Sequence, residues 1–303
     1  MKNKEFLGVI PPVITIFDKS GEINENKQRK FISFLINAGV QGLFVCGSFG
    51  SGLIMSKDQR KKALEICFDE VKNRIPCIAH VGSPSTQTSV ELAKYAELLG
   101  FSSISAVPPF YYKYNDDEII TYFSALINSV NVPVFAYNNP YTTGVLLTPD
   151  LLVTLAKKGL KGVKDSSLNM ESFIALSDKI ETEKLDFQCI IGTDSFWLGA
   201  KLAGAKAMVA GMSNIFPEFV VDFYNVSLRD DIEVAVKYQK KSIRLRNIMK
   251  MDKTPIPSYL AVLEMRGFNA GIPKAPFSSI DNASKEKLYK NLVAEGMGDF
   301  LKL

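Results

Sequence analysis

Short apolar runs alternate with amphipathic segments along the chain up to about residue 210. Most of these runs are apolar on both faces, which is the pattern of strands buried in a parallel sheet. The pattern predicts eight such strands, at residues 9–16, 42–46, 77–81, 103–107, 132–138, 162–165, 187–191 and 207–210. Strands of this kind need helices over their apolar faces, so the pattern indicates an α/β fold.

The segments between the strands show the 3.6-residue period of amphipathic helices. The clearest apolar stripes lie within residues 31–38, 64–71, 92–99 and 119–126. Two sequences resemble the capping boxes that mark helix starts, Ser56-x-x-Gln59 and Asn115-x-x-Glu118. Glycine is the residue that ends helices in the left-handed conformation without penalty. It follows four of the helical segments, at Gly39, Gly100, Gly159 and Gly204.

The number and order of these elements predict a (β/α)8 TIM barrel with a C-terminal helical extension. Such a barrel takes about 250 residues, and the chain has 303. We expect residues 1–216 to form the barrel core through strand eight. Residues 217–303 would add the last barrel helix and an extension packed on the barrel, within a single domain, with helical patterns at 231–251, 255–266 and 284–300.

A doubly wound open sheet is the rival fold. It requires a glycine-rich phosphate-binding turn after the first strand. Residues 17–21 (FDKSG) occupy that place and do not match such a turn. The barrel is therefore the favoured interpretation.

Composition and charge exclude several classes of protein. The hydrophobic share is 47% and the charged share 22%, as in ordinary globular proteins. The net charge is +4 and no block of Lys or Arg interleaves with aromatic residues, so nothing supports nucleic-acid binding. The N-terminus lacks the apolar core of a signal peptide, and no segment has the length and apolarity of a transmembrane helix. We therefore expect a cytoplasmic protein with no membrane partner.

The potential metal ligands are few and scattered. The four cysteines, at positions 46, 67, 77 and 189, lie in apolar contexts without CxxC spacing, so we expect buried free thiols. One histidine, His80, does not complete a usual zinc site with them. A histidine satisfied at a strand end is favoured over a ligand. A hydrolase built around His80 would need a G-x-S-x-G elbow, which is absent.

Two residues at the ends of neighbouring strands carry the most informative chemistry, Tyr137 and Lys164. Burial disfavours the charged form of an amine and lowers its pKa. A neutral lysine amine can form a Schiff base with a keto substrate, and a nearby phenol can move protons. A lysine whose stem lies in the wall and whose head reaches solvent is the alternative, and for a lysine considered alone it is favoured.

Other polar residues follow the same ends of the predicted strands. In a barrel the active site gathers there. The polar residues at these strand ends include Ser48, Tyr111, Tyr112 and Asp194. The glycine-rich turn at residues 47–52 has backbone N–H groups that could bind an anion, although a turn that simply needs positive φ explains the glycines equally well.

Five short motifs, in register over nearly the whole chain, resemble those of the dihydrodipicolinate synthase/N-acetylneuraminate lyase superfamily of Schiff-base, pyruvate-handling aldolases. They are Gly47-Ser48-Phe49-Gly50, Pro109-Phe110-Tyr111-Tyr112, Tyr137-Asn138-Asn139-Pro140, Gly162-Val163-Lys164-Asp165 and Gly192-Thr193-Asp194. The resemblance implies a small-molecule 2-oxo acid substrate and pyruvate as a product or partner substrate. It also implies no metal and no organic cofactor, because the substrate is held covalently on the lysine.

The resemblance assigns a role to each matching position. Lys164 would form the Schiff base, and Tyr137 would act as general acid and base. Ser48 would extend the proton relay, and Tyr111 would complete it from a neighbouring subunit, because the family usually forms homotetramers that are dimers of dimers.

The remaining positions that the resemblance assigns bind the substrate. The turn with Gly47, Ser48 and Phe49 would anchor the pyruvate carboxylate, and Gly192, Asp194 and Gly211 would contact the rest of the substrate.

Other interpretations stay open for several of these residues. Tyr111 and Tyr112 are equally well explained as ordinary interface aromatics. Asp194 is alternatively a cap of the following helix. Asp165 alternates away from Lys164 on the strand, so we interpret it as structural.

Three departures from the family pattern bear on the substrate. Phe49 and Ser51 stand where the family turn has a hydroxyl residue and an acid, which removes a donor from the carboxylate pocket. Residues 141–144 (YTTG) offer no Arg for aspartate semialdehyde, which disfavours lysine biosynthesis. Ser195 replaces the Glu with which sialic-acid lyases grip the sugar tail.

We therefore expect a class I aldolase that reversibly cleaves a 2-oxo-3-deoxy sugar acid, such as 2-keto-3-deoxygluconate, to pyruvate and an aldehyde. N-acetylneuraminate lyase and 4-hydroxy-tetrahydrodipicolinate synthase are the alternative enzymes. A non-catalytic relative that binds a 2-oxo acid and regulates a pathway is the alternative from another class. Phe49 and Ser51 favour that last interpretation, whereas the retained Lys164 and Tyr137 oppose it.

Overall fold

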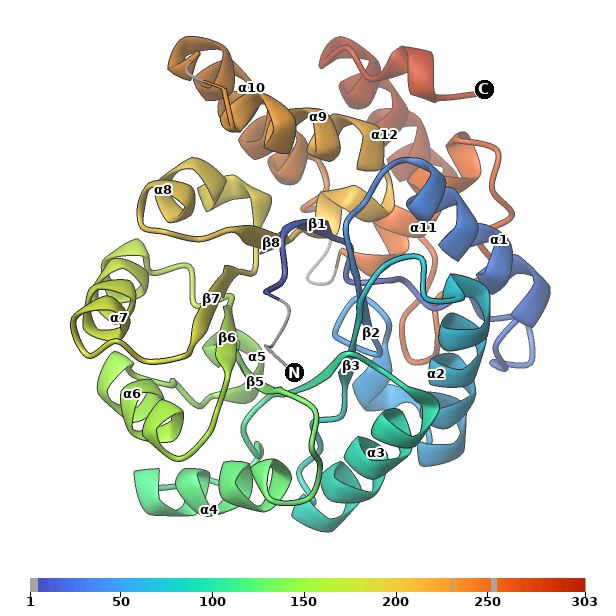
Figure 1. The fold of residues 1–303 in the computed structure, drawn as a ribbon. Helices are drawn as coiled ribbons and strands as arrows, with labels where there is room; N and C mark the ends of the chain where they lie inside the picture. Colours follow the sequence, from blue (N-terminus) through green and yellow to red (C-terminus); the bar gives the residue numbers. More distant parts are fainter. Residues whose placement is uncertain (1–4, 230, 252–254, 303) are drawn as a thin grey trace.

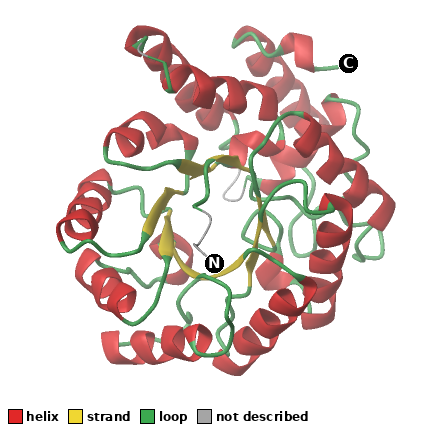
Figure 2. Ribbon diagram, in the orientation of Figure 1, coloured by secondary structure: helices red, strands yellow, loops and turns green. Residues whose placement is uncertain are grey.

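Eight parallel strands form one sheet that curls into a barrel, with helices around the outside (Figures 1 and 2). The structure, a computed structural model, describes residues 5–229, 231–251 and 255–302. The order along the sheet is β1-β8-β7-β6-β5-β4-β3-β2, and a bridge between Pro12 and Phe44 joins the segment after β1 to β2. The predicted (β/α)8 barrel is thereby confirmed.

All eight predicted strands are present. They are β1 (Gly8–Ile10), β2 (Leu43–Val45), β3 (Cys77–His80), β4 (Ser103–Ala106), β5 (Val134–Asn138), β6 (Gly162–Asp165), β7 (Gln188–Ile191) and β8 (Ala207–Val209). The first is much shorter than the predicted 9–16. It ends at Ile10 because Pro11 and Pro12 follow, and proline has no N–H to donate to a ladder.

The helices around the barrel are α1 (Glu25–Asn37), α2 (Lys57–Val71), α3 (Thr86–Leu99), α4 (Asp116–Ile127), α6 (Pro149–Lys157), α7 (Met170–Thr182), α8 (Trp197–Leu202) and α9 (Pro217–Ser227), with the short α5 (Pro140–Thr143) after β5. Both predicted capping boxes form, at Ser56 and at Asn115. The glycines expected at helix ends all have positive φ: Gly39, Gly100, Gly159 and Gly204.

Three further helices follow the barrel: α10 (Ile232–Ile248), α11 (Ile256–Met265) and α12 (Asn282–Ala294). Helix α10 packs on α9 and α12, and α12 packs on α11 (Figure 1). Helix α10 packs on the short helix η2 (Asp194–Phe196) that follows β7. The Gln239 side chain of α10 donates to the Asp194 and Ser195 carbonyls, at 3.0 and 2.9 Å. The extension therefore covers part of the carboxyl-terminal end of the barrel.

The barrel interior has its own apolar cluster, separate from the layer between strands and helices. Phe6 packs edge-on against Phe135, with ring centroids 5.6 Å apart. The Gln188 side chain accepts from the Phe6 N–H at 3.0 Å and donates to its carbonyl at 2.6 Å. Because Phe6 and Phe135 of this cluster fill the amino-terminal end of the barrel, the opposite end remains for chemistry.

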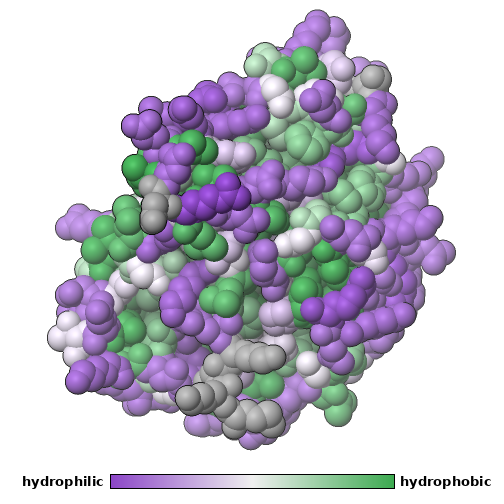
Figure 3. All heavy atoms as spheres, turned by 45° about the horizontal axis from the view of Figure 1, so that its top comes forward, coloured by the Kyte–Doolittle hydropathy of each residue, from purple (hydrophilic) through white to green (hydrophobic). Residues whose placement is uncertain are grey.

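Hydrophilic residues predominate on the face seen in Figure 3, with apolar residues grouped between them. Among the helices of the described part of the chain, none is both long and apolar enough to cross a membrane.

The capping box of α2 stabilises the helix that follows the glycine-rich turn. We expect Ser56→Ala to lower the free energy of unfolding by about 1 kcal/mol, because the Gln59 N–H loses the acceptor it has at 3.1 Å. Ser56→Asp is the matched control, since aspartate also caps helices. Urea denaturation of the three proteins measures the difference, and equal losses in both variants would contradict the capping role.

Candidate active site

Lys164 and Tyr137 lie side by side in the barrel wall. The parallel pairing of β5 with β6 places them opposite each other. Lys164 Nζ is 3.7 Å from the centroid of the Tyr137 ring and 4.2 Å from that of Phe44. Each of the two side chains is only 4% exposed. The lysine head therefore does not reach solvent, which removes the alternative left open by the sequence.

Burial changes the acid–base properties of this lysine. Desolvation lowers the pKa of Lys164 from its ordinary value, while Tyr137 acts in the opposite direction through its charge and a hydrogen bond. Desolvation wins, because a charged amine loses most of its hydration in such a site. A larger share of the amine is thus neutral, and nucleophilic, than in a free lysine.

Tyr137 is held by several polar neighbours. Burial acts to raise its pKa, but the Lys164 charge and hydrogen bonds with Ser48, Lys164 and Ser166 outweigh burial and lower the pKa below its usual value. Asn139 Nδ2 also donates to the phenol oxygen at 3.1 Å. The structure therefore brings Ser48, Tyr137 and Lys164 together, as the resemblance implies. A phenol of lowered pKa suits proton transfer.

Three members of this cluster were not predicted from the sequence: Phe44, Asn139 and Ser166. Asn139 lies inside the quoted Tyr-Asn-Asn-Pro motif, so its position was a signal that could have been used. Phe44 looks like any other apolar residue of a buried strand, and only its contact with Lys164 distinguishes it.

The glycine-rich turn after β2 is tight. The Ser51 N–H donates to the Ser48 carbonyl and the Gly52 N–H to the Gly47 carbonyl, both at 3.1 Å. A Cβ on Gly52 would lie 1.7 Å from the Cys46 carbonyl oxygen, so only glycine fits there. Within the described residues, neither the Ser48 nor the Phe49 N–H donates a hydrogen bond. Both remain able to bind an anion.

A cavity of about 250 Å³ lies at the carboxyl-terminal end of the barrel and gathers the other predicted substrate residues. The Phe49 ring packs edge-on against Tyr259 of α11, with centroids 4.9 Å apart. A Cβ on Gly211 would come within 2.6 Å of this ring. Gly211 is therefore glycine because the Phe49 ring occupies the space beside it. The lining consists of Phe49, Gly192, Thr193, Asp194, Gly211, Arg246, Met249, Lys250, Pro255 and Tyr259.

Asp194 is a buried carboxyl group in this cavity. Burial raises its pKa, against the lowering effects of a hydrogen bond from Ser242 and the charge of Arg246. It does not cap η2, which was the alternative from the sequence. Thr193 is the cap, since its side chain accepts from the Ser195 N–H at 3.2 Å. Asp194 is thus anchored to α10 by Ser242.

Tyr111 lies apart from this cluster within the single chain. It is 86% exposed and Tyr112 68% exposed, and their rings meet edge-on with centroids 5.1 Å apart. Tyr111 has a φ of +86°, which is rare for a residue with a side chain. The backbone is thus held in a conformation that projects this aromatic pair from the loop after β4.

His80 and Asp165 have structural surroundings. Burial holds the pKa of His80 well below its usual range. The neutral ring lies with Nδ1 3.2 Å from the Cys46 carbonyl, and Nε2 accepts from the Val107 N–H at 3.3 Å. The Asp165 carboxylate accepts from Asn138 at 2.9 Å and from the Ser167 hydroxyl at 2.6 Å. The interpretation of both as satisfied structural residues agrees with these contacts.

The four cysteines are free thiols, three of them buried and Cys189 half-buried. In the ranges 5–229, 231–251 and 255–302, no three His, Cys, Asp or Glu side chains are grouped in a way that could hold a metal ion.

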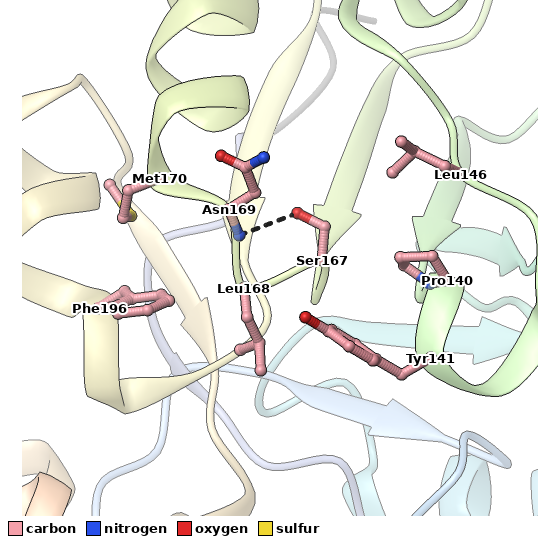
Figure 4. Close-up of a pocket in the computed structure, with 8 residues that line it drawn as sticks. All are labelled: Pro140, Tyr141, Leu146, Ser167, Leu168, Asn169, Met170 and Phe196. Atoms are coloured by element: carbon pink, nitrogen blue, oxygen red, sulfur yellow. Dashed lines mark hydrogen bonds between the residues drawn. The ribbon is translucent and has the colours of Figure 1, made fainter.

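A larger cavity of about 710 Å³ lies at the rim of the barrel, between the loops after β5, β6 and β7 (Figure 4). Its only marked hydrogen bond runs from the Asn169 N–H to the Ser167 hydroxyl, at 3.3 Å. The lining is largely apolar and includes Pro140, Tyr141, Leu146, Leu168, Met170 and Phe196. Because it lacks acidic and basic side chains, we place the chemistry at the smaller cavity and Lys164.

Comparisons with known proteins find relatives over nearly the whole chain. A probable 2-dehydro-3-deoxy-D-pentonate aldolase, YjhH of Escherichia coli K12, is 30% identical over 301 residues, covering 97% of this chain and 99% of its own. A 4-hydroxy-tetrahydrodipicolinate synthase of Methanopyrus kandleri is 31% identical over 293 residues, covering 96% of each chain. The crystal structure of YagE of E. coli K12 in complex with pyruvate superposes with a TM-score of 0.92 at 26% identity, covering 96% of this chain and 99% of its own.

These relatives carry different activities on one fold, so they do not define the substrate of this chain. Members of the family are lyases and aldolases, and this protein is an enzyme of that kind. The model of the dihydrodipicolinate synthetase family matches residues 5–295, and the chain belongs to that family.

Proposed function

We propose that this protein is a class I aldolase that reversibly cleaves a 2-oxo-3-deoxy sugar acid, of the 2-keto-3-deoxygluconate type, to pyruvate and an aldehyde. The observation that carries the proposal is the buried Lys164 amine against the Tyr137 ring. One relative is named as a probable 2-dehydro-3-deoxy-D-pentonate aldolase, and the substrate in that name belongs to this class. No metal or organic cofactor enters the proposed reaction.

The reaction begins with attack of the neutral Lys164 Nζ on the C2 carbonyl of the substrate. The Tyr137 phenol supplies one proton, so that loss of water leaves an iminium between Nζ and C2 and a phenolate on Tyr137. Tyr137 then takes the proton of the C4 hydroxyl, and the C3–C4 bond breaks. Its electron pair moves into the enamine while the aldehyde leaves. Protonation at C3 and hydrolysis of the iminium release pyruvate and restore the free lysine.

The surrounding residues position this chemistry. Ser48 and Asn139 hold the Tyr137 phenol through hydrogen bonds. The Ser48 and Phe49 N–H groups would bind the substrate carboxylate. Tyr111 would complete the relay from a neighbouring subunit of a dimer of dimers, a role that its outward exposure supports.

A condensing enzyme, 4-hydroxy-tetrahydrodipicolinate synthase, is the second candidate because a relative of similar identity carries that name. The loop after β5 argues against it. Residues 141–144 contain no basic side chain to bind the carboxylate of aspartate semialdehyde.

Lys164→Ala should abolish both pyruvate release from 2-keto-3-deoxygluconate and covalent trapping of pyruvate by borohydride, which we would follow by mass spectrometry. Lys161→Ala is the matched control. Lys161 lies just before the same strand and pairs with Asp186 at 2.7 Å, so its loss should leave trapping intact. Full turnover by the Lys164 variant would refute the mechanism.

Tyr137→Phe should lower kcat by about 10²–10⁴-fold, the usual contribution of a positioned acid–base group. The hydroxyl is lost while the ring keeps its packing on Phe44, with centroids 5.8 Å apart. Borohydride trapping of pyruvate should persist, because Schiff-base formation needs the lysine. A variant with unchanged kcat would remove Tyr137 from the relay.

The pH dependence of adduct formation should report the lowered pKa of Lys164. The nucleophile is the neutral amine, so the rate rises with pH through this pKa and levels off earlier than for a free lysine. Because Tyr137 acts to raise the Lys164 pKa, the Tyr137→Phe variant should level off at a still lower pH. A midpoint near that of free lysine in the wild type would contradict the effect of burial.

A further inference from the structure

The 250 Å³ cavity is connected to the strand of the proposed catalytic lysine through Gly192. Gly192 lines it, and the Gly192 N–H donates to the carbonyl of Asp165, the residue after Lys164, at 2.6 Å. A substrate whose C2 is bound to Lys164 would therefore extend its remaining carbons into this cavity. This step rests on the proposed aldolase function.

Two basic residues line the cavity, Arg246 near the end of α10 and Lys250 just after it. Arg246 makes no ion pair and donates no hydrogen bond to any residue of 5–229, 231–251 or 255–302. Its neighbour Arg244, in contrast, pairs with Glu295 of the segment after α12 at 2.8 Å. The two arginines of α10 are thus divided between a structural contact and the cavity.

The charge balance in the cavity favours an anion. Asp194 is the acidic residue of the lining, and its carboxyl group is engaged by Ser242 on α10. With two basic residues against one acid, whose carboxyl group accepts from Ser242, the lining has a net positive charge. An arginine with free donors binds carboxylate or phosphate by paired, charge-assisted hydrogen bonds.

We propose that Arg246, assisted by Lys250 at the rim, binds an anionic group at the distal end of the substrate. The preferred substrates are then 2-oxo-3-deoxy sugar acids that carry a second negative charge, as a terminal carboxylate or phosphate. The cavity volume equals the liquid volume of roughly eight water molecules, which accommodates a short polyol tail with such a group. Arg246 is a specificity residue and does not touch the reacting carbons.

Binding can be tested without turnover by calorimetry of the intact protein. The probes are glycerol 3-phosphate, glycerate and uncharged glycerol. We expect one or both anions to bind at least about tenfold more tightly than glycerol. Arg246→Gln should weaken the affinity for the anions about tenfold, and Lys250→Gln should weaken it less. Arg244→Gln, the matched control on the same helix, should leave it unchanged.

The two anions distinguish a phosphate site from a carboxylate site. Failure of both anions to bind the wild type, or equal affinity in the wild type and the Arg246→Gln variant, would overturn the proposal. Should Arg246→Gln fail to fold, an undiminished affinity in Lys250→Gln together with a loss in Arg244→Gln would overturn it as well.

Turnover then tests the substrate class. We would compare pyruvate release from 2-keto-3-deoxygluconate, its 6-phosphate ester and 2-keto-3-deoxyglucarate. We expect a substrate with a second, distal negative charge to have the highest kcat/KM, and Arg246→Gln to reduce its advantage about tenfold. Highest kcat/KM on 2-keto-3-deoxygluconate, which lacks the distal charge, would overturn the proposal. If none of the three substrates released pyruvate, the aldolase function would be refuted. The calorimetry would still decide whether the anion site exists.

Discussion

The contact between the Lys164 amine and the faces of two aromatic rings is the constraint on which the rest of the site depends. Nζ lies within 4.2 Å of the centroids of both Tyr137 and Phe44. A desolvated cation gains about 2 kcal/mol from such a ring. This gain offsets part of the cost of burying the ammonium group, although, within the described residues, no carboxylate side chain pairs with it. A carboxylate in the same place would hold the lysine charged and end its use as a nucleophile. The β5–β6 register sets Tyr137 opposite Lys164 and so makes this contact.

Much of this architecture could be predicted because its signals are local. The eight apolar runs, the capping box at Ser56 and the glycines such as Gly39 each reflect neighbouring residues in the chain. The pairing of Lys164 with Tyr137 also followed, since adjacent parallel strands end at the same edge. What sequence reasoning missed is non-local. Arg246 and Tyr259 reach the cavity only because the C-terminal helices fold back over the barrel, and no periodicity in residues 231–266 encodes that direction.

The single chain leaves one residue of the proposed relay outside the site. Tyr111 projects from the loop after β4 with a strained backbone and little contact of its own. Strained residues persist when function or assembly demands them. In the proposed dimer of dimers the exposed aromatic pair would be covered, and the relay from Tyr137 through Ser48 would gain its last member. Oligomerisation would then be a requirement for activity, and its effect on stability would be secondary.

Phe49 and Arg246 together suggest how binding energy is divided along the substrate. At the pyruvate end, Phe49 replaces a hydroxyl donor with a ring, which packs on Tyr259 and against Gly211. In the proposed reaction that end would rely on the backbone N–H groups of Ser48 and Phe49. At the distal end, the proposed anion contact with Arg246 would supply the energy withdrawn from the carboxylate pocket. Binding energy from a remote group orients the reacting bond and so raises kcat. A truncated substrate that lacks the distal anion should therefore lose turnover as well as affinity, since it retains only the weaker of the two anchors.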